Sequence, residues 1–259
     1  MKKETSTSAL VRGFAVLERV VQADRPIACA DLAVELGLPK PTVHRIAQQL
    51  EEQGLLQREP QGKRFMAAPR LRGFALAVLS NSVLGAARHA ILRALSEELQ
   101  ETCNCTMIDG QDLVYFDRVE TNWPYRINLP VGSRLPLYCT ASGKLFLAHM
   151  QPAQRRRLLA SVPLKRLTDR TITDPARLEA ELQQIRESGV GVDNEEYMRG
   201  LISLAVPVID RAGRICFALA VHSPTARKTL GELRQYLPSL RQAAAALSAC
   251  ECAGDDGPD

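Results

Sequence analysis

The apolar positions of the first part of the chain recur at the spacing of three short helices. Within residues 10–21 they fall three or four apart, which predicts an amphipathic helix. A second helix over residues 32–36 ends at Gly37, because glycine readily adopts the left-handed conformation of a helix cap. A third helix begins at Pro41, whose missing N–H is not needed in a first turn, and it ends at Gly54.

A different pattern follows the third helix. Residues 55–58 and 63–66 are two short strand candidates, and the intervening Pro and Gly supply turn chemistry, so we predict a β-hairpin, or wing. The next run, residues 71–84, is rich in Ala, Leu and Val with few charges. We expect a helix here that is too apolar to stay exposed and that packs against a partner chain. A further helix is predicted over residues 88–100.

The second half of the chain alternates apolar and polar residues as strands do, between helical segments. Turn residues separate several of these runs, which indicates antiparallel hairpins. We predict strands over residues 102–108, 113–116, 126–129, 201–209 and 215–221, and helices starting near residue 141, over residues 175–189 and over residues 230–249.

Composition narrows the class of protein. The 259 residues are 46% apolar and 24% charged, typical of a globular protein with two domains or one large one. No apolar stretch approaches the roughly 18 residues of a membrane helix and the start is polar, so we expect a cytoplasmic protein with no membrane partner. The seven cysteines, an odd number, favour reduced thiols over a disulfide framework.

The net charge of +4 is unevenly distributed. Residues 62–95 contain no acid, which marks a candidate polyanion-facing region, although a solvated basic face is the alternative. The basic residues of this tract are Lys63, Arg64, Arg70, Arg72, Arg88 and Arg93.

The second and third helices with their short turn have the spacing of a helix-turn-helix, whose second helix enters the DNA major groove. If the apolar side of the third helix faces the core, its hydrogen-bonding side chains point outward. There an Arg side chain can hydrogen-bond to the edge of a guanine, and a Gln side chain to the edge of an adenine. The alternative is that they form only the wet side of an amphipathic helix. The candidate DNA-binding residues are Lys40, Pro41, Thr42, His44, Arg45, Gln48, Gln49, Lys63 and Arg64, with Lys40, Lys63 and Arg64 suited to phosphates.

Three ordered segments carry a family resemblance. Residues 32–45 resemble the winged helix-turn-helix of the IclR-type bacterial transcriptional regulators. Residues 129–144 resemble the loop and helix start of that family's effector domain, and residues 193–197 resemble a third family segment. The similarity covers about residues 8–249.

The resemblance, with the pattern above, predicts an α+β protein. Residues 1–68 form a winged helix-turn-helix DNA-binding domain, and residues 69–85 form a linker and dimerisation helix. Residues 86–250 form a GAF-like effector domain whose mostly antiparallel sheet is flanked by helices, and residues 251–259 form a disordered tail.

The resemblance also implies an effector pocket for a small molecule. Residues 141–144 would offer backbone N–H groups at a helix start, a hydroxyl and the nearby cation of Lys144, which suits a small organic acid or an aromatic carboxylate. The pocket residues implied are Leu135, Ala141, Ser142, Asp193, Ser203, Ala220 and His222.

The chain departs from the family pattern at two places. Ala28 stands where the family often has Ser or Thr before the second helix, so a side-chain cap is lost. Ala220 and His222 stand where the family often has two serines. His222 replaces a hydroxyl with a titratable group able to pair with an acidic ligand; the alternative is a structural histidine. For Ser142 the alternative is a simple helix cap.

We therefore predict a ligand-responsive transcription factor, not an enzyme, with no cofactor and no metal. It would act as a homodimer, with a dimer of dimers left open, on a pseudo-palindromic double-stranded DNA operator of a catabolic operon, as repressor or activator. Two alternatives remain. One is a cysteine-based redox sensor or enzyme using Cys103, Cys105 or Cys139, which requires an accessible thiol of low pKa. The other is a DNA-binding protein without a ligand, whose sensor interior would be filled.

Overall fold

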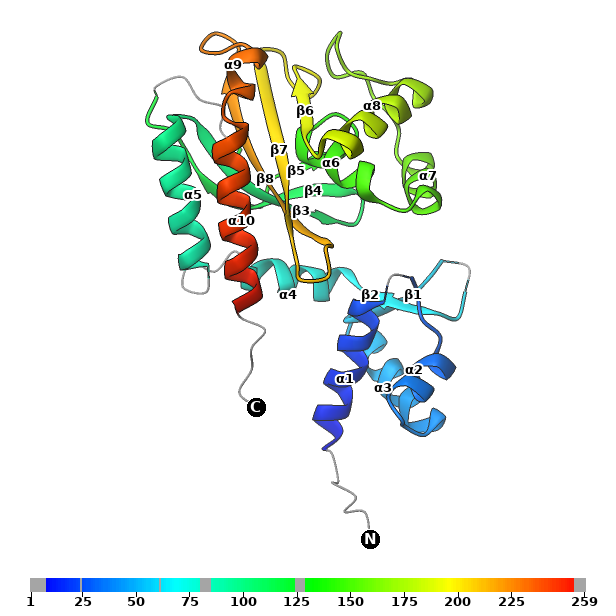
Figure 1. Ribbon diagram of the computed structural model, residues 1–259. Coiled ribbons are helices and arrows are strands. Elements are labelled where there is room, and N and C mark those ends of the chain that lie inside the picture. The colour runs from blue at the N-terminus through cyan, green and yellow to red at the C-terminus, as the bar shows by residue number, and fades with distance from the viewer. Residues whose placement is uncertain (1–7, 24, 61, 80–84, 124–128, 254–259) are drawn as a thin grey trace. The chain divides into compact units, whose positions relative to one another are not determined.

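The structure, a computed structural model, describes residues 8–23, 25–60, 62–79, 85–123 and 129–253 (Figure 1). It divides into two compact units, Met1–Val78 and Leu79–Asp259, which are described separately below. The helix that we predicted as a linker, α4 (Pro69–Leu79), lies at the boundary between them, and residues 80–84 of the predicted helix are outside the described residues.

The first unit contains the three predicted helices and the predicted hairpin. Val16, Val20, Leu32, Val43 and Phe65 form much of its small core, so each helix and the hairpin contribute to one hydrophobic cluster. The elements are α1 (Ala9–Gln22), α2 (Cys29–Glu35), α3 (Lys40–Glu52), β1 (Leu56–Arg58) and β2 (Phe65–Ala67), with β1 and β2 antiparallel.

Local chemistry explains where α2 and α3 begin and end. Gly37 adopts a φ of 61° just after α2, as predicted for a left-handed cap. Ala28 is the N-cap of α2 and its side chain makes no capping bond, which confirms the lost cap. Pro41 lies in the first turn of α3, where its missing N–H leaves no hydrogen bond unmade.

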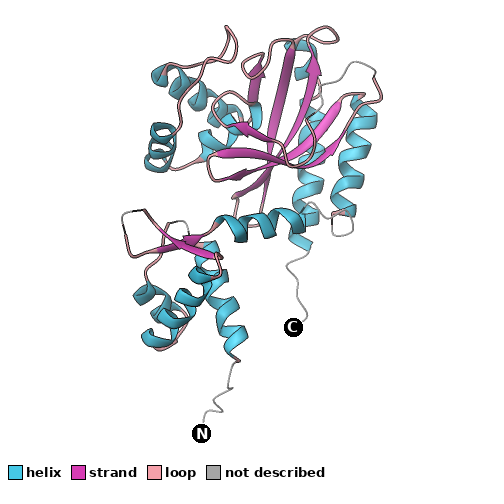
Figure 2. Ribbon diagram, turned by 180° about the vertical axis from the view of Figure 1, so that it is seen from behind, coloured by secondary structure: helices cyan, strands magenta, loops and turns pink. Residues whose placement is uncertain are grey.

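The second unit is built on a six-stranded sheet in the order β5-β4-β3-β8-β7-β6, with every pair antiparallel (Figure 2). The predicted α+β class with a mostly antiparallel sheet is therefore confirmed. The strands are β3 (Thr102–Asp109), β4 (Asp112–Val119), β5 (Arg134–Pro136), β6 (Gly191–Asn194), β7 (Leu201–Ile209) and β8 (Ile215–Pro224).

Helices flank this sheet. The helices α5 and α10 pack together and against the sheet, whereas α6 contacts five of its strands from β3 to β8 and leans on α8 (Figures 1 and 2). The helices are α5 (Ala86–Leu99), α6 (Ala141–His149), α7 (Pro152–Ser161), α8 (Pro175–Ser188), α9 (Leu230–Arg234) and α10 (Leu237–Ala253).

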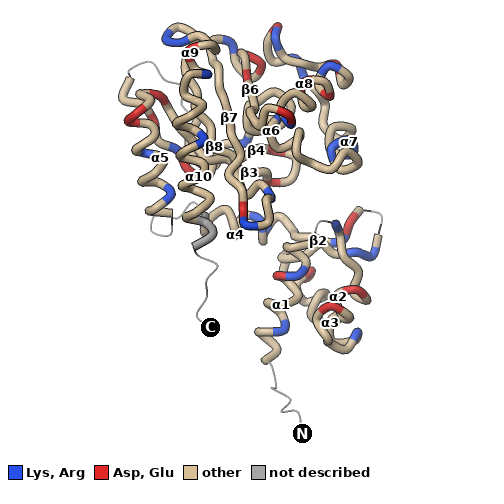
Figure 3. Tube along the Cα trace, in the orientation of Figure 1, with Lys and Arg blue, Asp and Glu red and all other residues tan. Residues whose placement is uncertain are grey.

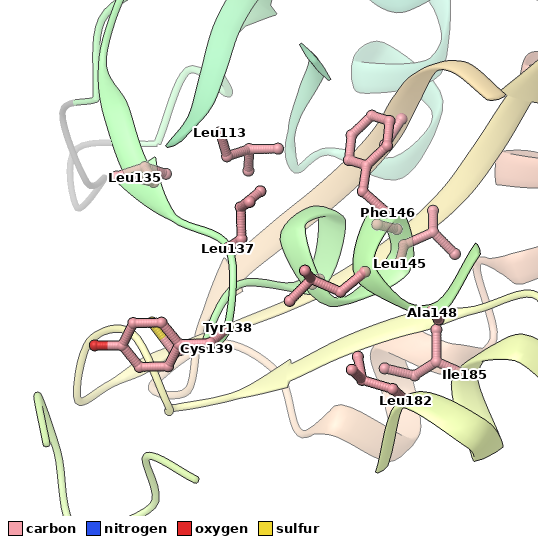
Figure 4. Packing of buried hydrophobic residues seen from close by; sticks show 14 of the residues in the cluster. Leu113, Leu135, Leu137, Tyr138, Cys139, Leu145, Phe146, Ala148, Leu182 and Ile185 are labelled. Carbon is pink, nitrogen blue, oxygen red and sulfur yellow. The ribbon is translucent and has the colours of Figure 1, made fainter. Parts of the chain in front are cut away.

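The helix α6 is buried along its whole length except at its end, and its apolar side chains form a core with α8 (Figure 4). Two glycines permit the close packing at its start. A Cβ on Gly143 would lie 2.3 Å from the carbonyl oxygen of Leu137, and a Cβ on Gly191 would lie 2.1 Å from that of Ala141. Both contacts are too short for any side chain, so glycine is required at both positions.

Several predicted boundaries were wrong. The predicted last helix is split into α9 and α10, because Pro238 inside one continuous helix would clash with the carbonyl of Arg234. The helix α10 extends to Ala253, so residues 251–253 are helical and not part of a tail; residues 254–259 lie outside the described residues. The predicted strand over 126–129 falls largely on residues 124–128, which are also outside them, and α7, β5 and β6 were not predicted.

Candidate functional site

The helix α3 presents a hydrogen-bonding surface to solvent. Val43, Ile46 and Ala47 are buried against the core of the first unit. The predicted outward-facing side chains are exposed, except that Thr42 is half-buried; they are Thr42, His44, Arg45, Gln48 and Gln49. Because hydrophobic packing holds one side of the helix, the opposite side is a rigid array of donors and acceptors, as readout of base edges requires.

The candidate phosphate contacts lie at two other places in the same unit. Lys40 is exposed at the start of α3, and Lys63 and Arg64 are exposed in the loop of the β1-β2 hairpin. Pro41, the remaining candidate DNA-binding residue, is exposed next to Lys40. The hairpin loop therefore carries positive charge, which is the chemistry that a wing needs to contact a DNA backbone.

The basic tract of residues 62–95 is divided in sequence between the two units, and each unit carries some of its lysines and arginines (Figure 3). Arg70 donates to the carbonyl of Gln53 at 2.5 Å, where it supports the end of α3. Arg88 is buried and donates to the Asp117 carboxylate at 3.0 Å. Since Arg88 does not face solvent, the interpretation of the whole tract as one polyanion-facing region is wrong; Lys63 and Arg64 of the hairpin loop are exposed and remain candidates.

The second unit encloses a small cavity of about 20 Å³, which is room for about one water molecule. All seven residues that the family resemblance implied line it: Leu135, Ala141, Ser142, Asp193, Ser203, Ala220 and His222. They come together through strand register, since Asp193 is paired with Ser203 on β7 and Ser203 is paired with His222 on β8. The structure thus gathers the predicted residues, while their role in ligand binding stays a prediction.

Asp193 is a buried acid at this cavity. Its Oδ1 accepts hydrogen bonds from the backbone N–H of Glu196 at 2.8 Å and of Tyr197 at 3.4 Å. Burial raises the pKa of Asp193 to about 7; the hydrogen bond from the Glu196 backbone N–H opposes this rise, the Glu196 carboxylate adds to it, and Lys144 opposes it. Near neutral pH this carboxyl is therefore available both as an acceptor and, when protonated, as a donor.

His222 is also buried, and both of its ring nitrogens have polar neighbours. Nδ1 lies 3.3 Å from Asn104 Nδ2, and Nε2 lies 3.3 Å from Arg118 Nη2. Burial, together with the charge of Arg118, lowers the pKa of His222 to about 3. The imidazole is thus neutral at physiological pH, so His222 could pair with an acidic ligand only through its neutral ring N–H; that pairing stays a prediction.

Lys144 does not supply the predicted cation. Its side chain is completely buried, and Nζ is bonded to Glu181 at 3.0 Å and, more closely, to Glu196. It does not line the cavity; instead it ties α6 to α8 and to the segment after β6. Of the groups predicted at the start of α6, the Ser142 side chain and the backbone of Ala141 remain available to a ligand.

The cavity has polar lining residues that the sequence analysis missed. Asn104 on β3 lies beside Ala220 in the sheet register, and Tyr115, Thr140 and Tyr197 complete the wall. A signal for Asn104 was present, because polar residues alternate with Cys103 and Cys105 along this strand. Alternation cannot show which face of a strand meets a cavity when both faces are buried, as they are along most of β3.

The three cysteines of the redox alternative lack the required reactivity. Cys103, Cys105 and Cys139 are fully buried. Burial raises the pKa of the Cys103 and Cys139 thiols above the ordinary range, whereas a reactive thiol needs an accessible position and a lowered pKa. These side chains are packing residues of the second unit.

Other candidate sites are less suitable. A larger cleft of about 740 Å³ beside α8 is lined mainly by polar and charged residues, and Arg170 there already bonds Asn194 at 3.0 Å. Within the described ranges, no group of three or more His, Cys, Asp or Glu side chains is placed to hold a metal ion. Nor does any helix in this part of the chain have the length and apolar character to cross a membrane.

Comparisons with known proteins identify the family. Residues 9–60 match the IclR helix-turn-helix domain, and residues 76–249 match the bacterial transcriptional regulator IclR C-terminal domain. The chain belongs to the IclR family of bacterial transcriptional regulators. This confirms the predicted family, and with it the prediction of a transcriptional regulator rather than an enzyme.

Individual IclR proteins agree with this assignment. The Probable transcriptional regulator SauR of Cupriavidus necator is 47% identical over 92% of this chain and 95% of its own length. The crystal structure of the Thermotoga maritima IclR protein superposes with a TM-score of 0.62 at 27% identity, covering 93% of this chain and 97% of that one. The inducer-binding domain of PobR from Acinetobacter, a double mutant in complex with 3-hydroxybenzoic acid, has a TM-score of 0.58 at 30% identity, covering 62% of this chain and 94% of the domain.

Proposed function

We propose that this IclR-family regulator binds a pseudo-palindromic operator through α3 and controls a catabolic operon in response to a small organic acid or an aromatic carboxylate. The observation that carries the DNA-binding part is the exposed hydrogen-bonding side of α3 opposite a packed core. Arg45 and the glutamines Gln48 and Gln49 would read base edges, while Lys40, Lys63 and Arg64 contact phosphates. Because operators lie on the bacterial chromosome, the proposal places the protein in the cytoplasm.

The cavity of the second unit supports the effector part of the proposal. It is lined largely by buried residues, it collects polar groups from five of the six strands, and PobR holds an aromatic carboxylic acid in its structurally similar inducer-binding domain. A ligand regulates DNA binding only through a difference in affinity between two conformations. Effector binding would therefore select one conformation of the second unit and, through the dimer, change the placement of the α3 helices.

Exposed apolar side chains support a homodimer. On α1, Phe14 is 63% exposed, and on α4, Phe74 is 67% exposed; Leu10 and Val78 add to these surfaces. Apolar side chains of this size rarely remain in water when they gather on one element. A homodimer that covers them would present two α3 helices to half-sites about 34–36 Å apart, or a multiple of that distance. Sedimentation velocity of Phe74→Glu should show a shift toward monomer.

The decisive experiment measures binding to the DNA upstream of the protein's own gene at several salt concentrations. We compare the wild type with Arg45→Ala, and with Arg156→Ala as a matched control, since Arg156 is exposed on α7 in the other unit. We expect a steep salt dependence for all three proteins and a loss of about 10–100-fold in specific affinity for Arg45→Ala alone. Equal affinities of wild type and Arg45→Ala, or no specific complex on that DNA or on neighbouring intergenic DNA, would contradict the proposal.

A further inference from the structure

The cavity of the second unit is too small for the small organic acid or aromatic carboxylate that we propose as its ligand. Its volume of about 20 Å³ holds roughly one water molecule, whereas sites for small organic ligands occupy about 300 Å³ or more. A permanently filled interior is what a regulator without a ligand would have. The lining, however, is not that of a filled apolar core, because Asn104, Asp193, Ser203 and His222 all face the space. A side chain must therefore move before a ligand enters.

His222 is the side chain whose removal would open the most space from β8. The other β8 residue at the cavity, Ala220, and the facing Ser142 and Ser203 are small. Both polar contacts of the imidazole are 3.3 Å long, beyond the usual length of about 2.9–3.0 Å for such bonds. His222 is thus a bulky side chain among the small side chains of Ala220, Ser142 and Ser203, and its two polar contacts are long.

A cation lies directly behind His222. The Arg118 side chain is 3% exposed; its Nη2 is 3.3 Å from His222 Nε2, and its guanidinium lies 5.6 Å from the centre of the Tyr115 ring. Both His222 and Tyr115 line the cavity. Arg118 also approaches Glu120 at 3.3 Å, but Glu120 is 29% exposed and its charge is partly screened by solvent. The guanidinium is therefore separated from the cavity by only two side chains.

Arg118 favours an anion in the cavity, and the acidic lining residue, Asp193, opposes an anion only when it is ionised; burial raises the pKa of Asp193 to about 7. Lys144, another buried cation of the second unit, is placed between two carboxylates, so it contributes no excess positive charge. In a site of low dielectric an arginine fork stabilises a carboxylate or another oxyanion far more than it stabilises a neutral group of the same shape.

The hydrogen bonding of His222 is consistent with an acceptor role toward Arg118. An arginine only donates, so Nε2 must accept from it and Nδ1 must carry the ring proton. That proton needs an acceptor, and Asn104 Oδ1 is buried without a hydrogen bond within the described part of the chain. Rotating the Asn104 amide by 180° brings Oδ1 to Nδ1 and satisfies both groups. The neutral imidazole then presents a lone pair to Arg118, as an anion would.

From these contacts we infer that His222 is an internal substitute for the effector's anionic group: it occupies the site next to Arg118 until an oxyanion displaces it and becomes the partner of the guanidinium. The inference rests on the proposed effector role of the cavity, and it names the residues that select an anionic effector over a neutral one. Arg118 and His222 together are specificity-determining residues for an anionic effector.

The test replaces His222 with a smaller residue and measures whether small molecules bind in the space that the imidazole leaves. His222→Ser leaves space for acetate, and acetamide is a neutral probe of the same shape. We measure the melting temperature of the full chain with acetate as the sodium salt, against sodium chloride at equal ionic strength, and with acetamide. For His222→Ser we expect acetate to raise the melting temperature by about 3–5 °C at a tenfold excess over its Kd, and acetamide to have little effect. The wild type should respond less to acetate, because the imidazole competes for the site.

The double variants establish that Arg118 is responsible. Combining His222→Ser with Arg118→Gln should abolish the preference for acetate, whereas combining it with Arg156→Gln, the same change on exposed α7, should leave the preference intact. If the Arg118→Gln double variant does not fold, Arg118→Lys replaces it; the charge is kept but the fork is lost, so acetate binding should weaken with no change for acetamide. An equal response of His222→Ser to both probes, no response to acetate, or a preference that survives loss of the guanidinium would overturn the inference.

Operator binding by the wild type separates this inference from the proposed function. If the wild type binds operator DNA but the variants show no acetate preference, the anion selector alone is wrong. If the wild type itself binds no operator, the proposed function fails whatever the result with acetate.

Discussion

The exposed surface of α3 and the cavity of the second unit are both polar, but they are assembled in opposite ways. The α3 surface consists of neighbouring turns of one helix, and its side chains are exposed. The cavity takes residues from every strand of the six-stranded sheet and from α6, and most of them are buried. Exposed polar groups can therefore be changed with little effect on stability, whereas each buried polar group is also part of the fold.

The largest expected effect is at a buried cation. Lys144→Ala leaves Glu196 and Glu181 without the ammonium that joins them, so the free energy of unfolding should fall by about 3–5 kcal/mol. Urea unfolding measures this loss. Lys40→Ala, at the exposed start of α3, is the matched control and should change stability by less than about 0.5 kcal/mol. Similar decreases in the free energy of unfolding for Lys144→Ala and Lys40→Ala would show that buried and exposed charges contribute equally to stability, against this comparison.

A second prediction concerns the pH dependence that burial gives to Asp193. The unfolded carboxyl ionises near 3.8 and the folded one near 7, so between these values the folded state binds more protons. This contribution to stability is therefore full below pH 3.8 and is lost as the pH rises to about 7, by roughly 4 kcal/mol at most. His222 acts in the opposite sense, because its pKa falls to about 3 on folding and the unfolded state binds the proton.

The variant Asp193→Asn isolates the first of these contributions. Relative to the wild type, its free energy of unfolding should rise as the pH increases from 5 to 7 and then level off. Urea titrations at several pH values measure the difference between the two proteins. Parallel curves for wild type and variant over this range would show that Asp193 keeps an ordinary pKa, and that the cavity wall is wetter than its burial indicates.

A smaller effect is expected on the exposed surface, in affinity rather than stability. Lys63→Gln in the β1-β2 loop removes one phosphate contact, so binding should weaken similarly on specific and non-specific DNA. The slope of log affinity against log salt should fall by about 0.9. Lys165→Gln, an exposed lysine of the second unit, is the control and should leave the slope unchanged. An unchanged slope for Lys63→Gln would exclude the hairpin loop as a wing that contacts the backbone.

The smallest expected effect is a gain in stability in the first unit. Ala28→Ser restores a side-chain acceptor at the N-cap of α2, whose backbone already has the extended conformation of a cap. Thermal unfolding should show a gain of about 0.5–1 kcal/mol. Ala30→Ser, inside the same helix, is the control and should be neutral or slightly destabilising. Equal effects of the two serines would mean that α2 does not gain from a cap.

Local signals predicted much of the fold correctly. The αL glycine after α2, the proline in the first turn of α3 and the Asp174-Pro175 start of α8 each fix an element through the conformation of one or two residues. The short strands β5 and β6 escaped prediction because three or four residues carry too little periodicity. Their pairing depends on partners far along the chain.

The candidate sites show the same division. The outward side of α3 follows from the sequence alone, because helical periodicity makes exposure a local property. The sequence also shows Lys144 two residues after Ser142, but Lys144 is neutralised by Glu181 from α8 and by Glu196 from the segment after β6, which come together only when the chain folds. Likewise, Arg118 came to lie behind His222 only when β3 paired with both β4 and β8. The energy of a buried charge depends on which distant groups share its dielectric surroundings, and no local pattern encodes that.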